Sequence, residues 1–236
     1  MTIDARPHKF TLDTSTTALL VIDLQNDFLH PQGFCCAMHG VETSTVERVR
    51  SIIPRIVGVI DWARRSGVKV VYTRESHAPD FSDVTPSKKV RYENAGYPIG
   101  APGKFGGFLI RGDRSSALID ELAPIDGEWQ YDKPGQGAFY ATTLEADLRA
   151  AGIDTLLFTG VTTECCVLAT FRQAADLGFF TLLLEDCCAA FEPREHEAAL
   201  DVLLGENGAI GWVATSDALV RSAMPRALDG HDVPVP

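Results

Sequence analysis

The stretch that decides the fold runs from Ile153 to Thr170 and reads IDTLLFTGVTTECCVLAT. Its first part, residues 155–158, is a short apolar run of the kind found in buried strands. The run breaks at Thr159-Gly160, and apolar residues then recur at the spacing of one helix face. These residues are Val167, Phe171, Ala174 and Ala175. The stretch therefore predicts a strand, a tight turn and a helix, a geometry that exposes a residue at the top of an α/β sheet.

Cys166 falls in the first turn of the expected helix, where unpaired backbone N–H groups and the helix dipole favour an anion. A thiol in that place is expected to ionise more easily, and the thiolate is the nucleophilic form of cysteine. The alternative is a small buried hydrophobic residue, and position alone leaves the two interpretations open. Cys165, beside it, points elsewhere on the helix and is interpreted as packing.

Strands and helices are expected to alternate along the chain. Apolar runs predict strands at 17–23, 68–73, 128–132, 155–158, 179–184 and 209–213. Helical patterns lie at 53–65, 116–122, 142–151 and 193–204, besides the helix of Cys166 and a last short one that Ser216 caps. The residues Thr142 to Glu145 fit a capping box. The alternation predicts a mostly parallel sheet with helices on both faces, a three-layer α/β/α fold.

Length and composition fit one domain. The 236 residues, 45% of them hydrophobic, suffice for one α/β core, so we interpret 1–236 as a single domain. Residues 1–16 are polar and are expected to form an irregular arm over the surface. Residues 78–115 form a long Pro- and Gly-rich insertion, which in a compact domain usually has a function or contacts a partner. Its cationic side chains serve that function or form a solvated face: Lys88, Lys89, Arg91, Arg111 and Arg114.

Charge and cysteine content exclude several classes of protein. The net charge of −11 and the pI near 4.9 argue against binding to nucleic acid or to an anionic membrane surface. No apolar run approaches the ~18 residues of a transmembrane helix, and residues 1–10 lack the apolar core of a signal peptide. The six cysteines form three adjacent pairs, which is neither a disulfide framework nor a zinc pattern. We therefore expect reduced thiols in a cytoplasmic protein.

Three further positions are candidates for a site. Asp23 ends the first expected strand, and the ligand crevice of an open α/β sheet lies at that end, although the residue could also cap a turn. Phe28 follows in a loop, where it either walls a site or packs. Lys133 follows the third expected strand, a place where a lysine is ordinarily a solvated surface charge.

Three motifs resemble those of the isochorismatase-like cysteine hydrolases. This superfamily includes nicotinamidases, N-carbamoylsarcosine amidohydrolase, ureidoacrylate amidohydrolase and biuret hydrolase. The motifs are GVTTECCV at 160–167, LVIDLQNDF at 20–28 and DKPG at 132–135, in the family's order. The resemblance extends from about Thr17 to Leu219. It implies a Rossmann-like sheet of six strands in the order 3-2-1-4-5-6. It also implies a homo-oligomer, with a tetramer as the expected form and the 78–115 loop near a subunit contact.

The resemblance assigns roles to the candidate residues. It implies that Cys166 is the nucleophile, that Asp23 is the acid/base and that Lys133 keeps Asp23 ionised and supports the thiolate. The backbone N–H groups of Thr162 and Cys166 are the expected oxyanion hole. A cis peptide bond between Val161 and Thr162 would aim the first of these donors inward. Phe28 is then expected to line the substrate pocket.

Glu75 and His77 align with two positions that bind metal in the nicotinamidase branch. Glutamate replaces the usual aspartate, and no third histidine follows in a matching frame. The other interpretation is a polar loop held by hydrogen bonds. We therefore predict no metal and no cofactor.

The expected substrate is a small ureido compound. The segments 72–75, 100–103, 132–139 and 185–188 look most like biuret hydrolases. This implies that biuret or a close ureide is hydrolysed with release of ammonia. Biuret hydrolases tend to carry a substrate-gripping glutamine near 205–208, where Asn207 stands here, so Asn207 is the expected substrate-binding residue. The shorter side chain leaves triuret, N-carbamoylsarcosine and ureidoacrylate as alternatives.

Two other classes of function are alternatives to an amidohydrolase. An isochorismatase-type vinyl ether hydrolase uses the same fold without the cysteine. A non-catalytic scaffold would retain the fold alone. The presence of Asp23, Lys133 and Cys166 together argues against both.

Overall fold

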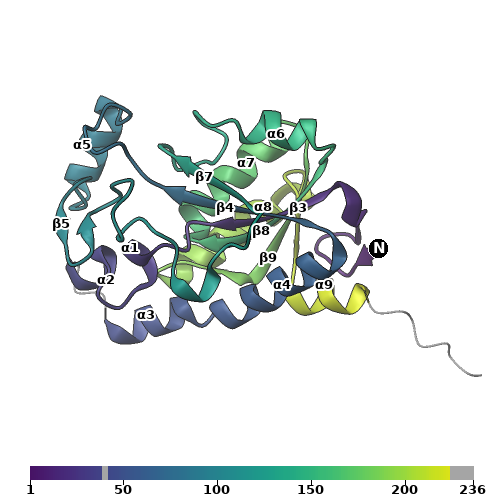
Figure 1. Cartoon of the computed structure of the whole chain (residues 1–236). Helices are drawn as coiled ribbons and strands as arrows, with labels where there is room; N and C mark the ends of the chain where they lie inside the picture. The colour runs from purple at the N-terminus through teal and green to yellow at the C-terminus, as the bar shows by residue number, and fades with distance from the viewer. Residues whose placement is uncertain (39–41, 224–236) are drawn as a thin grey trace, which may run out of the picture.

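A six-stranded parallel sheet forms the centre of the molecule, whose computed structural model describes residues 1–38 and 42–223 (Figure 1). The strands are β3 (Thr17–Ile22), β4 (Lys69–Glu75), β7 (Trp129–Lys133), β8 (Thr155–Val161), β9 (Phe180–Ala189) and β10 (Trp212–Ala214). They lie in the order β10-β9-β8-β3-β4-β7, and every neighbouring pair is parallel. If the six strands are numbered along the chain and the sheet is read from β7 to β10, the order is 3-2-1-4-5-6. The predicted strand order is therefore confirmed.

Helices cover both faces of the sheet and complete the predicted three-layer fold (Figure 1). One face packs against α4 (Ile53–Ser66) and α9 (Ser216–Ser222). The other packs against α6 (Leu144–Ala150), α7 (Leu168–Asp176) and α8 (Pro193–Gly208). The helix α3 (Thr43–Arg50) precedes α4. The two faces bury separate hydrophobic clusters, because successive residues of a strand point to opposite sides.

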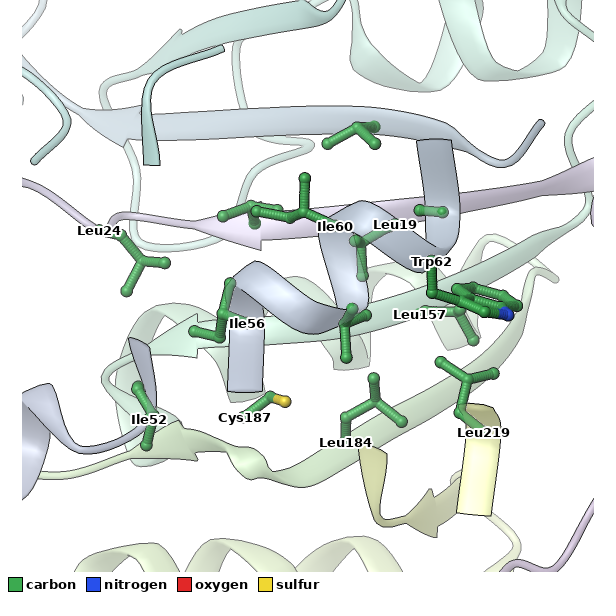
Figure 2. Packing of buried hydrophobic residues seen from close by; sticks show 14 of the residues in the cluster. Leu19, Leu24, Ile52, Ile56, Ile60, Trp62, Leu157, Leu184, Cys187 and Leu219 are labelled. Atoms are coloured by element: carbon green, nitrogen blue, oxygen red, sulfur yellow. The ribbon is translucent and has the colours of Figure 1, made fainter. Parts of the chain in front are cut away.

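The central strand β3 shows this division most clearly. Leu19 and Val21 belong to the cluster under α4, whereas Leu20 and Ile22 belong to the cluster under α7. Figure 2 shows the first cluster, in which Ile56 and Ile60 of α4 face Leu19, Leu157 and Leu184 of the sheet. A strand buried on both faces reads as a continuous apolar run, which explains why the sequence pattern located it.

Residues 1–16, predicted as an irregular arm, are partly ordered into strands. β1 (Thr2–Ile3) and β2 (Phe10–Thr11) pair in antiparallel fashion, and a short 3₁₀ helix, η1 (Thr14–Thr16), follows. Ile3 and Phe10 are buried, and the ring of Phe10 lies 5.2 Å from that of Trp212. The segment is therefore held by its alternate apolar residues, which the prediction of an irregular arm overlooked.

The insertion 78–115 also has structure of its own. It contains α5 (Pro86–Asn94) and the short strands β5 (Pro102–Gly103) and β6 (Gly106–Gly107). It packs on α1 (Asn26–Leu29) and α2 (Phe34–Met38) through a third apolar cluster. In that cluster the rings of Phe34 and Phe108 stack 4.3 Å apart. In Figure 1, α5 and β5 lie beside α1 and α2, off the end of the sheet.

Several predicted boundaries change in the structure. The predicted helix 116–122 is only the 3₁₀ turn η2 (Asp120–Leu122). The predicted capping box of Thr142 and Glu145 is wrong, because Thr143 is the residue that precedes α6, and it makes no side-chain cap bond. The hydroxyl of Thr142 accepts instead from the Leu144 N–H at 3.4 Å. The strand β4 extends two residues further than predicted, to Glu75, so Arg74 and Glu75 lie in the sheet. No helix within 1–38 and 42–223 has the length and apolarity that a membrane span requires.

Candidate active site

Four polar side chains converge at the carboxyl ends of adjacent strands. Asp23 follows β3, Glu75 ends β4 and Lys133 ends β7. Cys166 lies in η3 (Thr163–Val167), a π-helical turn between β8 and α7. Parallel strands present their carboxyl ends at one edge of a sheet, where open α/β folds bind ligands. π-helical turns are also frequent at functional sites.

Gly160 allows β3 and β8 to approach at this edge. Its φ of +123° suits glycine, and an added Cβ would lie 2.1 Å from the carbonyl oxygen of Ile22. The following peptide bond, between Val161 and Thr162, is cis. Asp23 itself has a φ of 54°, and its backbone N–H donates to the carbonyl of Thr73 at 3.1 Å. The close approach that Gly160 allows brings the ends of the two strands together, and ligand atoms of Asp23 and Cys166 lie within 4.8 Å of each other.

Asp23 and Lys133 form a fully buried pair. Lys133 Nζ lies 2.8 Å from Asp23 Oδ2, and both side chains are 0% exposed. Lys133 also donates to the carbonyls of Gly135 and Gln136, at 2.9 and 2.7 Å. The hydroxyl of Thr73 donates to Asp23 Oδ1 at 2.7 Å. The DKPG segment therefore turns the lysine inward, which the position after an outer strand did not indicate.

Burial and the neighbouring charges together decide the pKa values of this pair. It raises the pKa of Asp23, and the nearby Lys133 ammonium offsets this only in part. Burial alone would lower the pKa of Lys133, but the negative charges of Asp23 and its neighbours raise it overall. Lys133 is therefore a permanent cation, and Asp23 is a more basic carboxylate than one in water. The prediction that Lys133 keeps Asp23 ionised describes its charge effect but omits the larger effect of burial.

Glu75 is a second carboxylate beside the cysteine. Its Oε2 accepts a hydrogen bond from Cys166 Sγ at 3.2 Å and lies 3.7 Å from Lys133 Nζ. Its Oε1 accepts from Lys88 Nζ at 2.6 Å and from the Tyr92 hydroxyl at 2.5 Å. Burial would raise the pKa of Glu75, but the charges of Lys133 and Lys88 and these hydrogen bonds lower it to about 2. Glu75 is therefore a fixed anion, not part of a polar loop.

Cys166 is held as a thiol in this environment. A hydrogen bond with Cys165 and burial raise the pKa of Cys166 well above its usual range, and the charge of Lys133 offsets this only in part. The expectation that the start of the helix makes the thiol ionise easily is therefore wrong for the unliganded site. Burial and the neighbouring acidic groups outweigh the helix dipole, which acts only over the first turn.

A cavity of about 360 Å³ opens above Cys166. Phe28, Thr162 and Cys166 line it, as do residues of the insertion and of the loop after β7. The other lining residues are Cys35, Glu75, Arg91, Tyr92, Ala95, Tyr97, Phe108, Gln136, Glu164, Cys165 and Phe191. The size is that of a site for a small molecule.

Asn207 does not reach this cavity, which corrects its expected role in binding substrate. It is exposed, has a φ of 57°, and lies in the kink at the end of α8. A crossover helix returns the chain from the carboxyl ends of the strands to their amino ends. The end of α8 is therefore at the edge of the sheet opposite to Cys166, and similarity of sequence position was misleading.

The donor set does not fit a divalent metal ion. Among the residues that the structure describes, the cluster suited to a metal is Asp23, Glu75 and Cys166, whose ligand atoms lie within 4.8 Å of one another. Both carboxylates already bind lysine ammonium groups, which would repel a cation. His77 Nδ1 instead lies 3.1 Å from Asp83.

Lys88 and Tyr92 are the members of the cluster that sequence reasoning missed. Lys88 was placed in a charge run that could be a solvated face, but it is 4% exposed and bonded to Glu75. The two residues are four apart on α5, which puts them on one face of the helix. That spacing was the only signal in the sequence, and it does not indicate what the face contacts.

The fold and the arrangement at the edge of the sheet define a class, the isochorismatase-like hydrolases. The sequence matches the isochorismatase domain family over residues 17–218, and the chain belongs to this family. The predicted resemblance and fold are therefore confirmed.

Two curated relatives are described as the ureidoacrylate amidohydrolase RutB. The protein of Caulobacter segnis is 32% identical over 222 residues, which cover 91% of this chain and 88% of the relative. The protein of Yersinia enterocolitica is 30% identical over 230 residues, with coverage of 96% and 97%.

Solved structures are similar as well. The N-carbamoylsarcosine amidase of Thermoplasma acidophilum is 28% identical, with a TM-score of 0.65 and coverage of 86% of this chain and 97% of that one. An isochorismatase family protein of Desulfovibrio vulgaris is 26% identical, with a TM-score of 0.70 and coverage of 88% and 98%.

Proposed function

We propose that the protein hydrolyses a C–N bond of a small ureido compound, with Cys166 as the nucleophile. The observation that carries the proposal is the buried cluster of Asp23, Lys133 and Cys166 beneath one cavity. A nucleophile within reach of a carboxylate and a cation is the arrangement that acyl transfer requires. The relatives named as ureidoacrylate amidohydrolases and N-carbamoylsarcosine amidase support a ureido carbonyl as the group attacked.

The first step forms a bond between Cys166 Sγ and the carbonyl carbon. The thiol proton passes to Asp23, whose pKa is raised by burial and which is therefore a competent base. This transfer exchanges a thiol and a carboxylate for a thiolate and a carboxylic acid, so the net charge of the cluster does not change. Asp23 then gives the proton to the leaving nitrogen, which departs as ammonia when the C–N bond breaks.

The tetrahedral oxygen requires fixed donors during this step. The proposed donors are the backbone N–H groups of Thr162 and Cys166, the first of which belongs to the cis peptide bond between Val161 and Thr162. One such donor typically lowers the barrier by ~2.7–4 kcal/mol. A water that Asp23 deprotonates then attacks the thioester carbonyl, and the C–S bond breaks to regenerate the thiol.

Biuret or a close neutral ureide is the first candidate substrate. Biuret offers amide N–H and carbonyl groups and carries no charge, which suits a pocket that contains the amide of Gln136 and the hydroxyl-bearing Thr162. Asn207 no longer argues for a longer ureide, since its side chain lies outside the cavity.

A ureido acid is the second candidate, and Arg91 favours it. Arg91 lines the cavity, is exposed, and its side chain has no hydrogen bond or ion pair within 1–38 and 42–223. An unpaired guanidinium at a pocket is suited to a carboxylate, which it can bind with two parallel hydrogen bonds. Ureidoacrylate and N-carbamoylsarcosine carry such a carboxylate, whereas biuret and triuret do not.

The experiment that tests the function compares kcat/KM by ammonia release for biuret, triuret, ureidoacrylate, N-carbamoylsarcosine and nicotinamide. Arg91→Met should leave biuret hydrolysis within about threefold and reduce activity on a ureido acid by about tenfold or more, the loss of one charged hydrogen-bonding partner. The neighbouring Lys89→Met is the matched control. Preference for nicotinamide, or no turnover of any ureide, would contradict the proposal.

The proposal includes a homotetramer in the cytoplasm. All six cysteines are free, which fits a reducing compartment. The ordered insertion supplies a surface beside the cavity for a subunit contact. Light scattering at micromolar concentration should give the mass of a tetramer, and a monomer would refute this part of the proposal.

A further inference from the structure

The helix α5 of the insertion reaches into the buried cluster through two side chains. Lys88 Nζ donates to Glu75 Oε1 and to the carbonyl of Pro134, both at 2.6 Å. One turn further on, the Tyr92 hydroxyl donates to the same Oε1 at 2.5 Å. The next lysine, Lys89, is exposed, and its ion pair is with Glu93 of the same helix, at 4.0 Å. The burial of Lys88 is therefore specific to its position and not to the charge run.

A buried lysine is expensive unless its charge is paired, and an apolar side chain would usually anchor a helix equally well. The ion pair therefore calls for an explanation beyond packing. Glu75 supplies one, because its other oxygen accepts the hydrogen bond from Cys166 Sγ at 3.2 Å. A single carboxylate thus joins α5 to the proposed nucleophile.

We propose that Lys88 and Tyr92 are positioning residues of the reaction, which act through Glu75 to fix the orientation of the Cys166 thiol and the charge beside it. The inference rests on the proposed function only in taking Cys166 as the reacting group. Neither residue needs to touch substrate for this role. This role would make the insertion part of the active site. The sequence of the insertion suggested only a functional loop or a solvated face.

Several groups face Glu75, and each contributes to its charge state. They are Lys88 and Tyr92 of α5, Lys133 of β7, Asp23 after β3, Cys166 of η3, His77 after β4 and Cys35 of α2. With both lysines present, Glu75 is an anion across the usable pH range. Without Lys88, the effect of burial is opposed only by Lys133 and the Tyr92 hydrogen bond, so the pKa of Glu75 should rise.

Two pH effects follow for Lys88→Met. At low pH, Glu75 takes up a proton and ceases to accept from Cys166, so the acidic limb of kcat/KM, which protonation of Asp23 already gives the wild type, should shift to higher pH. At high pH, Glu75 is still ionised but a nearby cation is gone, so the pKa of Cys166 should rise by about one unit or more. Lys88→Arg should restore both profiles in part, since it restores the cation.

The first arm of the experiment measures the alkylation of Cys166 by iodoacetamide against pH, read at residue 166 by peptide mass spectrometry. The variants are Lys88→Met, Lys88→Arg and Tyr92→Phe, with Lys89→Met as the matched control. The expected result is a higher midpoint for Lys88→Met and an unchanged one for Lys89→Met. An unchanged midpoint in Lys88→Met, in protein that unfolds at the wild-type temperature, would overturn the inference.

The second arm is a double-mutant cycle on kcat/KM. Lys88→Met alone should lose about tenfold or more, the scale of one charged group acting through another. If Lys88 acts through Glu75, the double variant Glu75→Gln/Lys88→Met should be no slower than Glu75→Gln. Additive losses would show that Lys88 acts elsewhere. If the wild type hydrolyses no ureide, the proposed function fails, but the alkylation arm still decides this inference.

Discussion

Two buried carboxylate–lysine pairs flank Cys166, and they differ in their partners. Asp23 follows one strand of the central sheet and Lys133 ends another, and burial raises the pKa of Asp23. Glu75 and Lys88 join the sheet to the insertion, and the pKa of Glu75 is lowered to about 2. Two cations and the Tyr92 hydroxyl face Glu75, whereas Asp23 has one cation and a hydroxyl. The same chemical group is therefore a more basic carboxylate in one pair and a fixed anion in the other.

Loss of Cys166, the proposed nucleophile, should have the largest effect of all changes in this site. Cys166→Ser replaces the thiol by a hydroxyl that neither pair can ionise, so kcat should fall by about 10³-fold or more, on the scale of nucleophile removal in other hydrolases. Cys165→Ser, the neighbouring thiol, should cost less than about tenfold in the same ammonia-release assay. If the two variants exchanged their effects, the nucleophile would be Cys165.

Neutralising one carboxylate at a time tests the contrast between the pairs directly. Asp23→Asn cannot accept the thiol proton, so kcat should fall by about 100-fold or more. Glu75→Gln keeps a hydrogen-bond acceptor beside Cys166 and should cost only about tenfold, the lower end of what a positioning group contributes. The measurement is kcat of the two variants and the wild type, from steady-state kinetics at saturating substrate. Equal losses would mean that the two carboxylates share the role of base.

Stability should depend on pH with opposite sign for the two carboxylates. The folded pKa of Glu75 is about 2 against 4.5 for the free side chain, so its ionisation stabilises the fold above pH 4.5. That contribution, on the order of 3 kcal/mol, is lost as pH falls toward 2. Asp23 has a raised pKa, so its contribution is present at low pH and is lost as pH rises through the folded value.

Urea unfolding between pH 2 and pH 6 measures this effect for Glu75. The free energy of unfolding of the wild type should exceed that of Glu75→Gln at pH 6, and the difference should narrow as pH falls below 4.5. A difference that stays constant across this range would show that Glu75 is not held as an anion in the folded protein.

Removal of metal ions by chelation should have no effect on activity, which makes it the smallest of the expected effects. Lysine ammonium groups already occupy the carboxylates of Asp23 and Glu75, so a divalent ion has no place beside Cys166. Activity after exhaustive dialysis against EDTA should equal that of untreated enzyme. Loss of activity that zinc or iron restores would revive Glu75 and His77 as metal ligands.

The sheet and the Asp23–Lys133 pair could be predicted because their signals are local. Buried parallel strands appear as apolar runs, and Asp23 stands where the first of them ends. A place for Lys133 beside Asp23 was implied only by the resemblance of its motif, and the structure shows that the turn after β7 brings this side chain inward. The Glu75–Lys88 pair could not be predicted in this way, since it depends on how the insertion folds back on the sheet.

Two errors have the same origin in long-range structure. The place of Cys166 on a helix predicts easy ionisation, whereas the hydrogen bond with Cys165, burial and charged groups from other strands decide its pKa. The sequence position of Asn207 predicts a role in binding substrate, whereas the direction of α8 places this residue away from the cavity. The burial of the thiol and the direction of the helix both depend on contacts between residues that are distant along the chain.

The contribution of α5 to the wall of the cavity has a consequence for changing the range of substrates. Lys88 and Tyr92 on this helix are committed to Glu75, but Arg91 lines the cavity and Ala95, just after the helix, does so too. Variation at 91 and 95 would therefore reshape the pocket and alter its charge, while the chemistry at the ends of the strands stays intact. A focused library at these two positions is a practical starting point for engineering hydrolysis of larger or differently charged ureides.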